Sequence, residues 1–261
     1  MKNVSIKKSV VVLTALLLVG VLVVCVACQD TVDPYAGNYQ TVAAEDRNEV
    51  VTDTTAKLEE INENGLQHIE FTYKLNSSTE EDGETTAKNN TKVKLLVDGK
   101  KLYSEIDYDE TKNGETTKFK AKVWYDDENE EAWYKVVVDG ETFEGQYTSS
   151  TTGDEIQMAL IITVLLAPNM VTVVLGQFTD ALQDSATELY ADGNKLKIVA
   201  DTTEENETNK GEGYMIFAED GAFRFKLENT SKKTVDTKTD NEQTFAEIVS
   251  TTKTVTMPAS K

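Results

Sequence analysis

Four Asp-Gly pairs, each between two runs of alternating apolar and polar residues, constrain the fold of this chain most. They are Asp98-Gly99, Asp139-Gly140, Asp192-Gly193 and Asp220-Gly221. Both central residues of a type I′ hairpin turn need positive φ, which suits an Asp-Gly pair. An apolar residue at every second position is the period of a strand with one buried face. The pattern therefore predicts an antiparallel meander of about eleven strands.

Polar segments separate several of these predicted strands. They span residues 77–90, 109–115, 202–211 and 231–241, and they are rich in Thr, Glu, Asn and Lys. Such composition is typical of solvated hairpin connections, so we expect no binding site there. A short helix is predicted over residues 54–63, with Asp53 as its N-cap and Asn64-Gly65 as its stop.

Residues 156–178 form an uncharged apolar stretch between the two groups of predicted strands. The alternatives for this stretch are a membrane span, a pair of buried β-branched strands, and two helices joined at Pro168. The proline would break a spanning helix, and the flanking charges are acidic, with no Lys or Arg to set an orientation. A span would also place two halves of one sheet on opposite sides of the membrane. We favour two helices, over residues 154–167 and 169–185.

The N-terminus has the pattern of an export signal. Lys2, Lys7 and Lys8 precede an apolar run over residues 10–24, and small residues then lead to Cys28. The sequence around Cys28 resembles a bacterial lipobox, although Cys25 stands where Leu is usual. That resemblance implies a diacylated Cys28 as the mature N-terminus, anchored to the cell membrane outside the cytoplasm. An ordinary secretory signal or an uncleaved anchor is the alternative, and each also exports the rest of the chain.

These features divide the chain into a lipoprotein signal peptide (residues 1–27), a lipidated cysteine with its tether (28–50) and one antiparallel β domain (51–261). The domain carries the helical insert at about residues 154–186. We expect an α+β, mainly antiparallel β fold, with a curled sheet or half-barrel wrapped around a central apolar helix pair. This order of elements resembles the LolA/LolB and LppX/LprG-type lipoproteins. The resemblance implies that lipid or acyl chains are held between sheet and helices.

The net charge of −20, from 46 acidic and 26 basic residues, disfavours DNA, RNA and anionic membrane surfaces as partners. No cysteine follows Cys28, so the exported domain has neither a disulfide nor a thiolate metal site. Arginine occurs only at positions 47 and 224, which argues against arginine-based recognition of phosphate. We expect no metal and no cofactor.

Residues that could carry catalysis are few. His68 is the only histidine, and it lies on the strand side opposite Ile69, which predicts a solvated side chain. No nucleotide-binding or hydrolase motif occurs, and the many carboxylates form no distinctive pair. Five aromatic residues cluster on neighbouring predicted strands. We interpret them as core or cross-strand pairs in preference to a sugar or lipid platform: Tyr103, Trp124, Tyr125, Trp133 and Tyr134.

We therefore expect a non-catalytic, membrane-anchored lipoprotein that binds or carries a lipid or other apolar ligand between sheet and helices. The residues predicted to line that site are Met158, Ile162, Leu166, Val174 and Phe178. The alternative is a structural or interaction lipoprotein whose helices complete a dry core. A third hypothesis, an extracytoplasmic hydrolase, rests only on the abundance of carboxylates.

Overall fold

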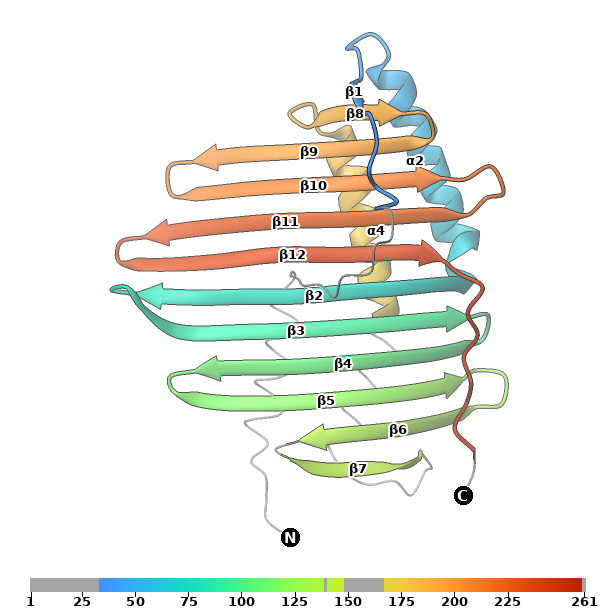
Figure 1. Cartoon of the computed structure of the whole chain (residues 1–261), viewed down its shortest axis with the longest axis vertical. Helices are drawn as coiled ribbons and strands as arrows, with labels where there is room; N and C mark the ends of the chain where they lie inside the picture. Colours follow the sequence, from blue (N-terminus) through green and yellow to red (C-terminus); the bar gives the residue numbers. More distant parts are fainter. Residues whose placement is uncertain (1–32, 139, 148–166, 260–261) are drawn as a thin grey trace.

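The computed structural model describes residues 33–138, 140–147 and 167–259. These residues form a twelve-stranded antiparallel sheet with α-helices on one face only (Figure 1). The first seven strands are β1 (Gln40–Thr41), β2 (His68–Glu81), β3 (Glu84–Asp98), β4 (Lys101–Lys112), β5 (Glu115–Asp126), β6 (Glu131–Val138) and β7 (Glu141–Gln146). The others are β8 (Glu188–Asp192), β9 (Lys195–Glu204), β10 (Glu207–Phe217), β11 (Phe223–Val235) and β12 (Lys238–Ser250).

Two hairpin-linked meanders meet at the centre of this sheet. The strand order is β1-β8-β9-β10-β11-β12-β2-β3-β4-β5-β6-β7, so β12 pairs with β2 and joins the C-terminal meander to the N-terminal one. β1 and β7 form the two edges, and the sheet is open. The predicted α+β, mainly antiparallel fold is confirmed. Six long strands precede the apolar stretch and five follow it, as the alternation predicts.

Tight turns at Gly-containing pairs account for the hairpins. Gly99, Gly193 and Gly221 have positive φ, but Asp98, Asp192 and Asp220 do not, so these three hairpins lack the type I′ turns that the Asp-Gly pairs predict. Two further pairs, Asp82-Gly83 and Asn113-Gly114, have positive φ at both residues and so have type I′ geometry. The prediction of irregular connections over residues 77–90, 109–115, 202–211 and 231–241 is therefore wrong, because nearly all these residues continue the strands. They are polar on both sides, so they show no apolar alternation, but Thr favours extended backbone.

Two helices cover the face that we call the inner face, and the opposite face is the outer face. They are α2 (Arg47–Asn64), followed by the 3-10 turn η1 (Gly65–Gln67), and α4 (Ala167–Gln183). α2 begins earlier than predicted, and α4 has Pro168 in its first turn, where the missing N–H needs no partner. The two helices contact each other. The predicted helix over residues 154–167 lies almost wholly outside the described residues.

One hydrophobic core lies between the inner face and the helices. Its fully buried members include Phe71, Val136 and Phe225 from the sheet and Leu182 from α4. No helix in the described ranges is long and apolar enough to cross a membrane. On the outer face, the segment before β1 crosses β9 to β11, and the tail after β12 runs along the strand ends toward β6 (Figure 1).

Candidate functional site

A groove on the outer face at the β5–β7 end of the sheet is larger than two other cavities in the described part of the chain. Trp124 of β5 and Trp133 of β6 are directly opposite each other, and Tyr103 of β4 is opposite Trp124. The rings of Tyr103 and Trp124 have centroids 5.2 Å apart. Strand alternation places all three on the same side as Lys122, and both indoles are only partly buried. Both indoles line the groove, and the Tyr103 ring packs beside Trp124.

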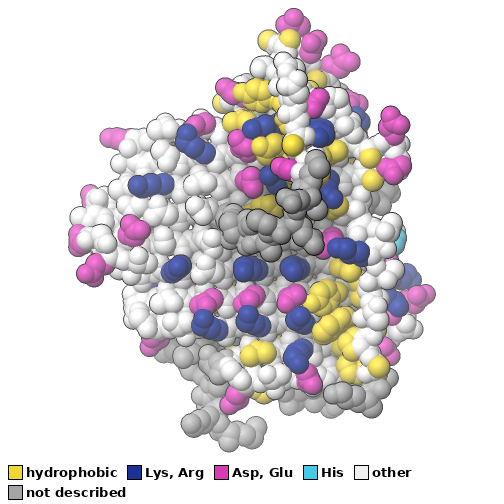
Figure 2. All heavy atoms as spheres, viewed as in Figure 1, with side chains coloured by type: hydrophobic (Ala, Val, Ile, Leu, Met, Phe, Trp, Pro, Cys, Tyr) yellow, Lys and Arg dark blue, Asp and Glu magenta, His cyan; other side chains and the backbone are white. Residues whose placement is uncertain are grey.

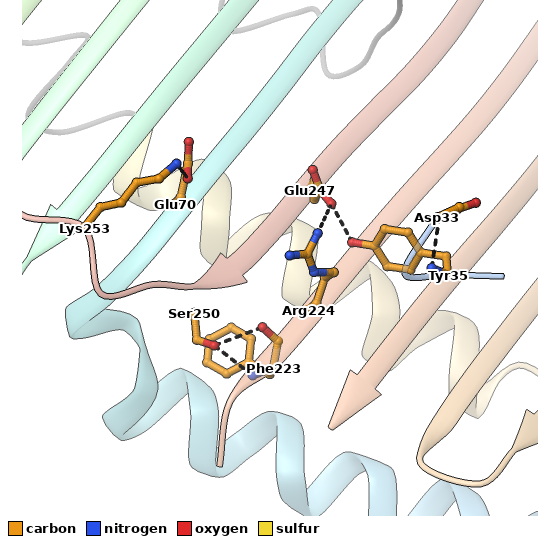
Figure 3. Close-up of polar contacts among 8 residues, drawn as sticks. All are labelled: Asp33, Tyr35, Glu70, Phe223, Arg224, Glu247, Ser250 and Lys253. Carbon is orange, nitrogen blue, oxygen red and sulfur yellow. Dashed lines mark hydrogen bonds and ion pairs between the residues drawn. The ribbon is translucent and has the colours of Figure 1, made fainter. Parts of the chain in front are cut away.

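The C-terminal tail forms one wall of this groove. Val255 is buried, and its N–H donates to the carboxylate of Asp98 at 3.0 Å, while Lys253 pairs with Glu70 (Figure 3). These contacts hold the tail against the sheet, so that Pro258 and Ala259 line the groove. The cavity measures about 520 Å³. That volume suits a small molecule or a single sugar ring with its substituents.

Polar groups surround the two indoles. Lys135 of β6 pairs with Glu144 of β7 at 2.7 Å, and Gln146 lies opposite Trp133. The Tyr103 hydroxyl donates to Glu105 at 3.0 Å, and burial together with this bond raises the pKa of the phenol above its usual value. The indoles can stack on a flat apolar surface, and the amide and charged groups can bind polar edges.

A ladder of charged side chains lies beside the groove. Figure 2 shows two rows of Lys separated by a row of acidic side chains, with a hydrophobic patch at their right-hand end. The acidic row is on β4, and each member pairs with a lysine of β5: Asp109 with Lys118 at 2.5 Å, Asp107 with Lys120 at 2.6 Å and Glu105 with Lys122 at 3.3 Å. A second cavity of about 300 Å³ lies within the ladder.

The third cavity lies on the inner face beside α4. It measures about 260 Å³, and Gln177 of α4 and Thr244 of β12 contribute to its lining. Glu242 follows on β12, one step further from the helix on the same face, between Ser77 and Ser231 of the neighbouring strands. Partial burial raises the pKa of the Glu242 carboxyl to about 7. The inner face therefore becomes polar where the strands extend past the helix.

The structure places only part of the predicted ligand site. Val174 and Phe178 lie on the buried side of α4, with exposed fractions of 4% and 1%. The Phe178 ring packs against Phe225 and above Gly213, and neither Val174 nor Phe178 lines any of the three cavities. Met158, Ile162 and Leu166 lie outside the described residues, as does Cys28. A ligand-binding role for these residues stays a prediction.

Sequence reasoning found the aromatic residues but not the groove. The cross-strand pair Trp124–Trp133 is confirmed, whereas Tyr125 and Tyr134 point to the inner face and pack against the core. The sequence does contain a signal for the groove. Trp124 is two residues from the solvated Lys122 on the same strand, so both side chains lie on the same face. His68 is exposed, as predicted. Within the described ranges, no three His, Cys, Asp or Glu side chains gather as metal ligands would.

The sequence matches none of the protein-family models and none of the curated proteins with which it was compared.

Proposed function

We propose that this chain is an extracytoplasmic, lipid-anchored, non-catalytic binding protein, whose outer-face groove takes a ligand with a flat apolar face and polar edges. A sugar ring has this combination, since its C–H face stacks on indole and its hydroxyls bond to amides and charged groups. One observation carries the proposal: both tryptophans of the chain lie side by side, partly exposed, in a groove of about 520 Å³. Tryptophan side chains that only fill the hydrophobic core would lie on the inner face of the sheet.

The test of the groove is a titration followed by tryptophan fluorescence, because its two indoles are the only ones in the chain. Soluble oligosaccharides of glucose and of N-acetylglucosamine serve as probes. Trp133→Ala should weaken binding at least tenfold, a loss of about 1.4 kcal/mol or more, since stacked aromatic anchors dominate such sites. Phe143→Ala is the matched control, because Phe143 is exposed on the neighbouring strand β7 but does not line the groove. Unchanged affinity in Trp133→Ala would refute the proposal.

The membrane anchor rests on the resemblance of the Cys28 region to a lipobox. Cys28→Ser removes the thiol that would be acylated and should move the protein from the membrane fraction to the soluble fraction. Cys25→Ser is the control and should stay in the membrane fraction. Mass spectrometry of the mature N-terminus would decide the matter, because a free amine at any residue other than Cys28 excludes a lipoprotein.

A second candidate is the carrier of an apolar ligand between sheet and helices, by analogy with the lipoproteins that the order of elements resembles. The cavity beside Gln177 of α4 favours it, since it lies between helix and sheet. The close packing of Val174 and Phe178 favours the alternative, a filled core. Solvent extraction of the purified protein distinguishes the two. A co-purified lipid or uptake of a fluorescent fatty acid would support the carrier, and absence of both would refute it.

A further inference from the structure

The outer face carries a basic patch on a strongly acidic chain. Its central rows, on β2 to β7, hold eight lysines against four carboxylates, a local formal charge of +4, whereas the whole chain carries −20. We call these residues the lysine patch: Lys74, Lys88, Lys92, Lys94, Lys118, Lys120, Lys122 and Lys135, with Glu105, Asp107, Asp109 and Glu144. The rows of Lys side chains are visible in Figure 2.

Three lysines of the patch are available to an external anion. Lys88, Lys92 and Lys94 of β3 are exposed, and none forms an ion pair in the described part of the chain. The lysines of β5 are paired with the acidic row of β4 instead. Charges separated by more than about 8 Å are screened at physiological salt, so a surface in contact with the patch experiences the lysines more than the distant carboxylates.

The N-terminal segment fixes which face is close to the proposed anchor. Tyr35 is buried on the outer face, where its ring packs on Tyr214 and its hydroxyl donates to Glu247 at 2.7 Å (Figure 3). Lys195 donates to the carbonyl oxygens of Pro34 and Ala36, at 3.0 Å and 2.6 Å. The chain is therefore held on the outer face at residues 34–36.

The chain length between the anchor and this segment limits where the membrane can be. Cys28 precedes Asp33 by five residues, which reach at most about 18 Å when fully extended. The opposite surface lies behind the sheet and a helix layer about 10 Å thick, about 20 Å away through the molecule and further around its edge. A lipid on Cys28 therefore keeps the outer face, and not the helices, toward the bilayer.

We propose that the lysine patch docks the outer face on an anionic lipid surface, an inference that rests on the proposed lipidation of Cys28. The occupant is the headgroup layer of the same membrane that holds the anchor. Each lysine close to an anionic surface strengthens binding about fivefold, and the anchor supplies a high effective concentration. Docking would also bring the aromatic groove, on the same face, close to the membrane surface.

The experiment compares lysine reactivity within one molecule. The full lipidated protein is reconstituted on vesicles of phosphatidylcholine, with or without one third phosphatidylglycerol, and acetylated. Mass spectrometry then gives the acetylation rates at Lys92 and Lys94, and at Lys57 of α2 as the internal control. We expect acetylation at Lys92 and Lys94 to slow about threefold or more on the anionic vesicles only, reversibly with high salt, and Lys57 to be unchanged.

Two triple variants distinguish an effect of the lysine patch from an effect of the net charge of the protein. In the parent protein, Lys120 on the same face should also be protected on anionic vesicles, and Lys88→Gln/Lys92→Gln/Lys94→Gln should abolish that protection. Lys57→Gln/Lys233→Gln/Lys238→Gln makes the same change of charge away from the outer face and should preserve that protection.

Several outcomes would overturn the docking proposal. One is that Lys92 and Lys57 are acetylated at equal rates on both kinds of vesicle, and another is that Lys57 is protected from acetylation instead of Lys92. A third is that soluble polyphosphate without vesicles protects Lys92 equally well, which would assign the patch to a soluble polyanion. A protein that does not float with either vesicle refutes the lipid anchor and is thereby distinguished from these results.

Discussion

Glu242 is a carboxyl that the folded chain holds half-buried on the inner face, and burial raises its pKa from 4.5 to about 7. Below pH 4.5 it is protonated in the folded and unfolded chain alike. Between pH 4.5 and 7 the unfolded chain releases the proton first, so the free energy of unfolding falls as pH rises. Discounted for solvent exposure, the loss is about 1 kcal/mol. Glu242→Gln should therefore be more stable than the parent above pH 7 and equal to it below pH 4.5.

Urea unfolding followed by circular dichroism at the two pH values measures this difference. Glu207→Gln is the control, because Lys233 and Asn209 hold the pKa of Glu207 below its usual range. Its ionised form is favoured by folding, so its removal should give no gain above pH 7. A Glu242→Gln variant with the same pH dependence as the parent would contradict the assignment.

Gly213 is required by the packing of α4 on the sheet. A Cβ at this position would lie 2.8 Å from Cε1 of Phe178, a ring that is 1% exposed. Gly213→Ala should lower the free energy of unfolding by about 1–3 kcal/mol, since overpacking forces the ring off its site. Gly211→Ala on the same strand is the control, because its nearest neighbour is 3.5 Å away. Phe178→Leu should rescue part of the loss, and equal stability of the two alanine variants would refute the close contact.

At the scale of elements, Arg47 joins α2 to the end of α4. Its guanidinium donates to the carbonyl oxygens of Asp184 at 2.7 Å and Thr187 at 2.8 Å, in the turn that follows α4. Arg47→Ala should cost about 1–2 kcal/mol and speed amide exchange in residues 184–187. Arg224→Ala, which removes the other arginine of the chain, should cost less than about 0.5 kcal/mol, because Arg224 is partly exposed and makes a 3.4 Å ion pair with Glu247 and a 6.0 Å contact with the Tyr35 ring. Comparable losses in both variants would contradict this role.

The elements were predictable from sequence where one face of a strand lies under a helix. Ile69 and Phe71 alternate with polar residues because the inner face is buried there, so β2 was found. Beyond Leu75 the sequence of β2 has the composition of a connection, because burial decreases past the helix and the apolar alternation ends with it. The Asp82-Gly83 pair is the sequence signal for this continuation, because Asp-Gly favours the type I′ turn that joins paired strands, and both residues have positive φ in the structure.

At the scale of the whole molecule, the candidate site depends on contacts between distant parts of the chain. The alternation of side chains along β5 and β6 is enough to place Trp124 and Trp133 on one face. The groove also needs the C-terminal tail, which is held in place by the hydrogen bond from Val255 to Asp98. That bond joins residues 157 positions apart in the sequence, and no local pattern indicates it. The lysine patch likewise appears only when β3, β4 and β5 are set in register, which the sequence alone leaves open.

Because the sheet has a single hydrophobic core, we expect a destabilising substitution at one end of the sheet to lower the free energy of unfolding at the other end as well. Both tryptophans lie on β5 and β6, whereas Gly213 lies on β10, across the junction of β12 with β2. One continuous hydrophobic cluster joins these regions, so we expect one cooperative transition. Gly213→Ala should shift the urea midpoint seen by tryptophan fluorescence by the same amount as the midpoint seen by circular dichroism, and Gly211→Ala should shift neither. A fluorescence midpoint that stays in place while circular dichroism shows two steps would mean that the two meanders unfold separately.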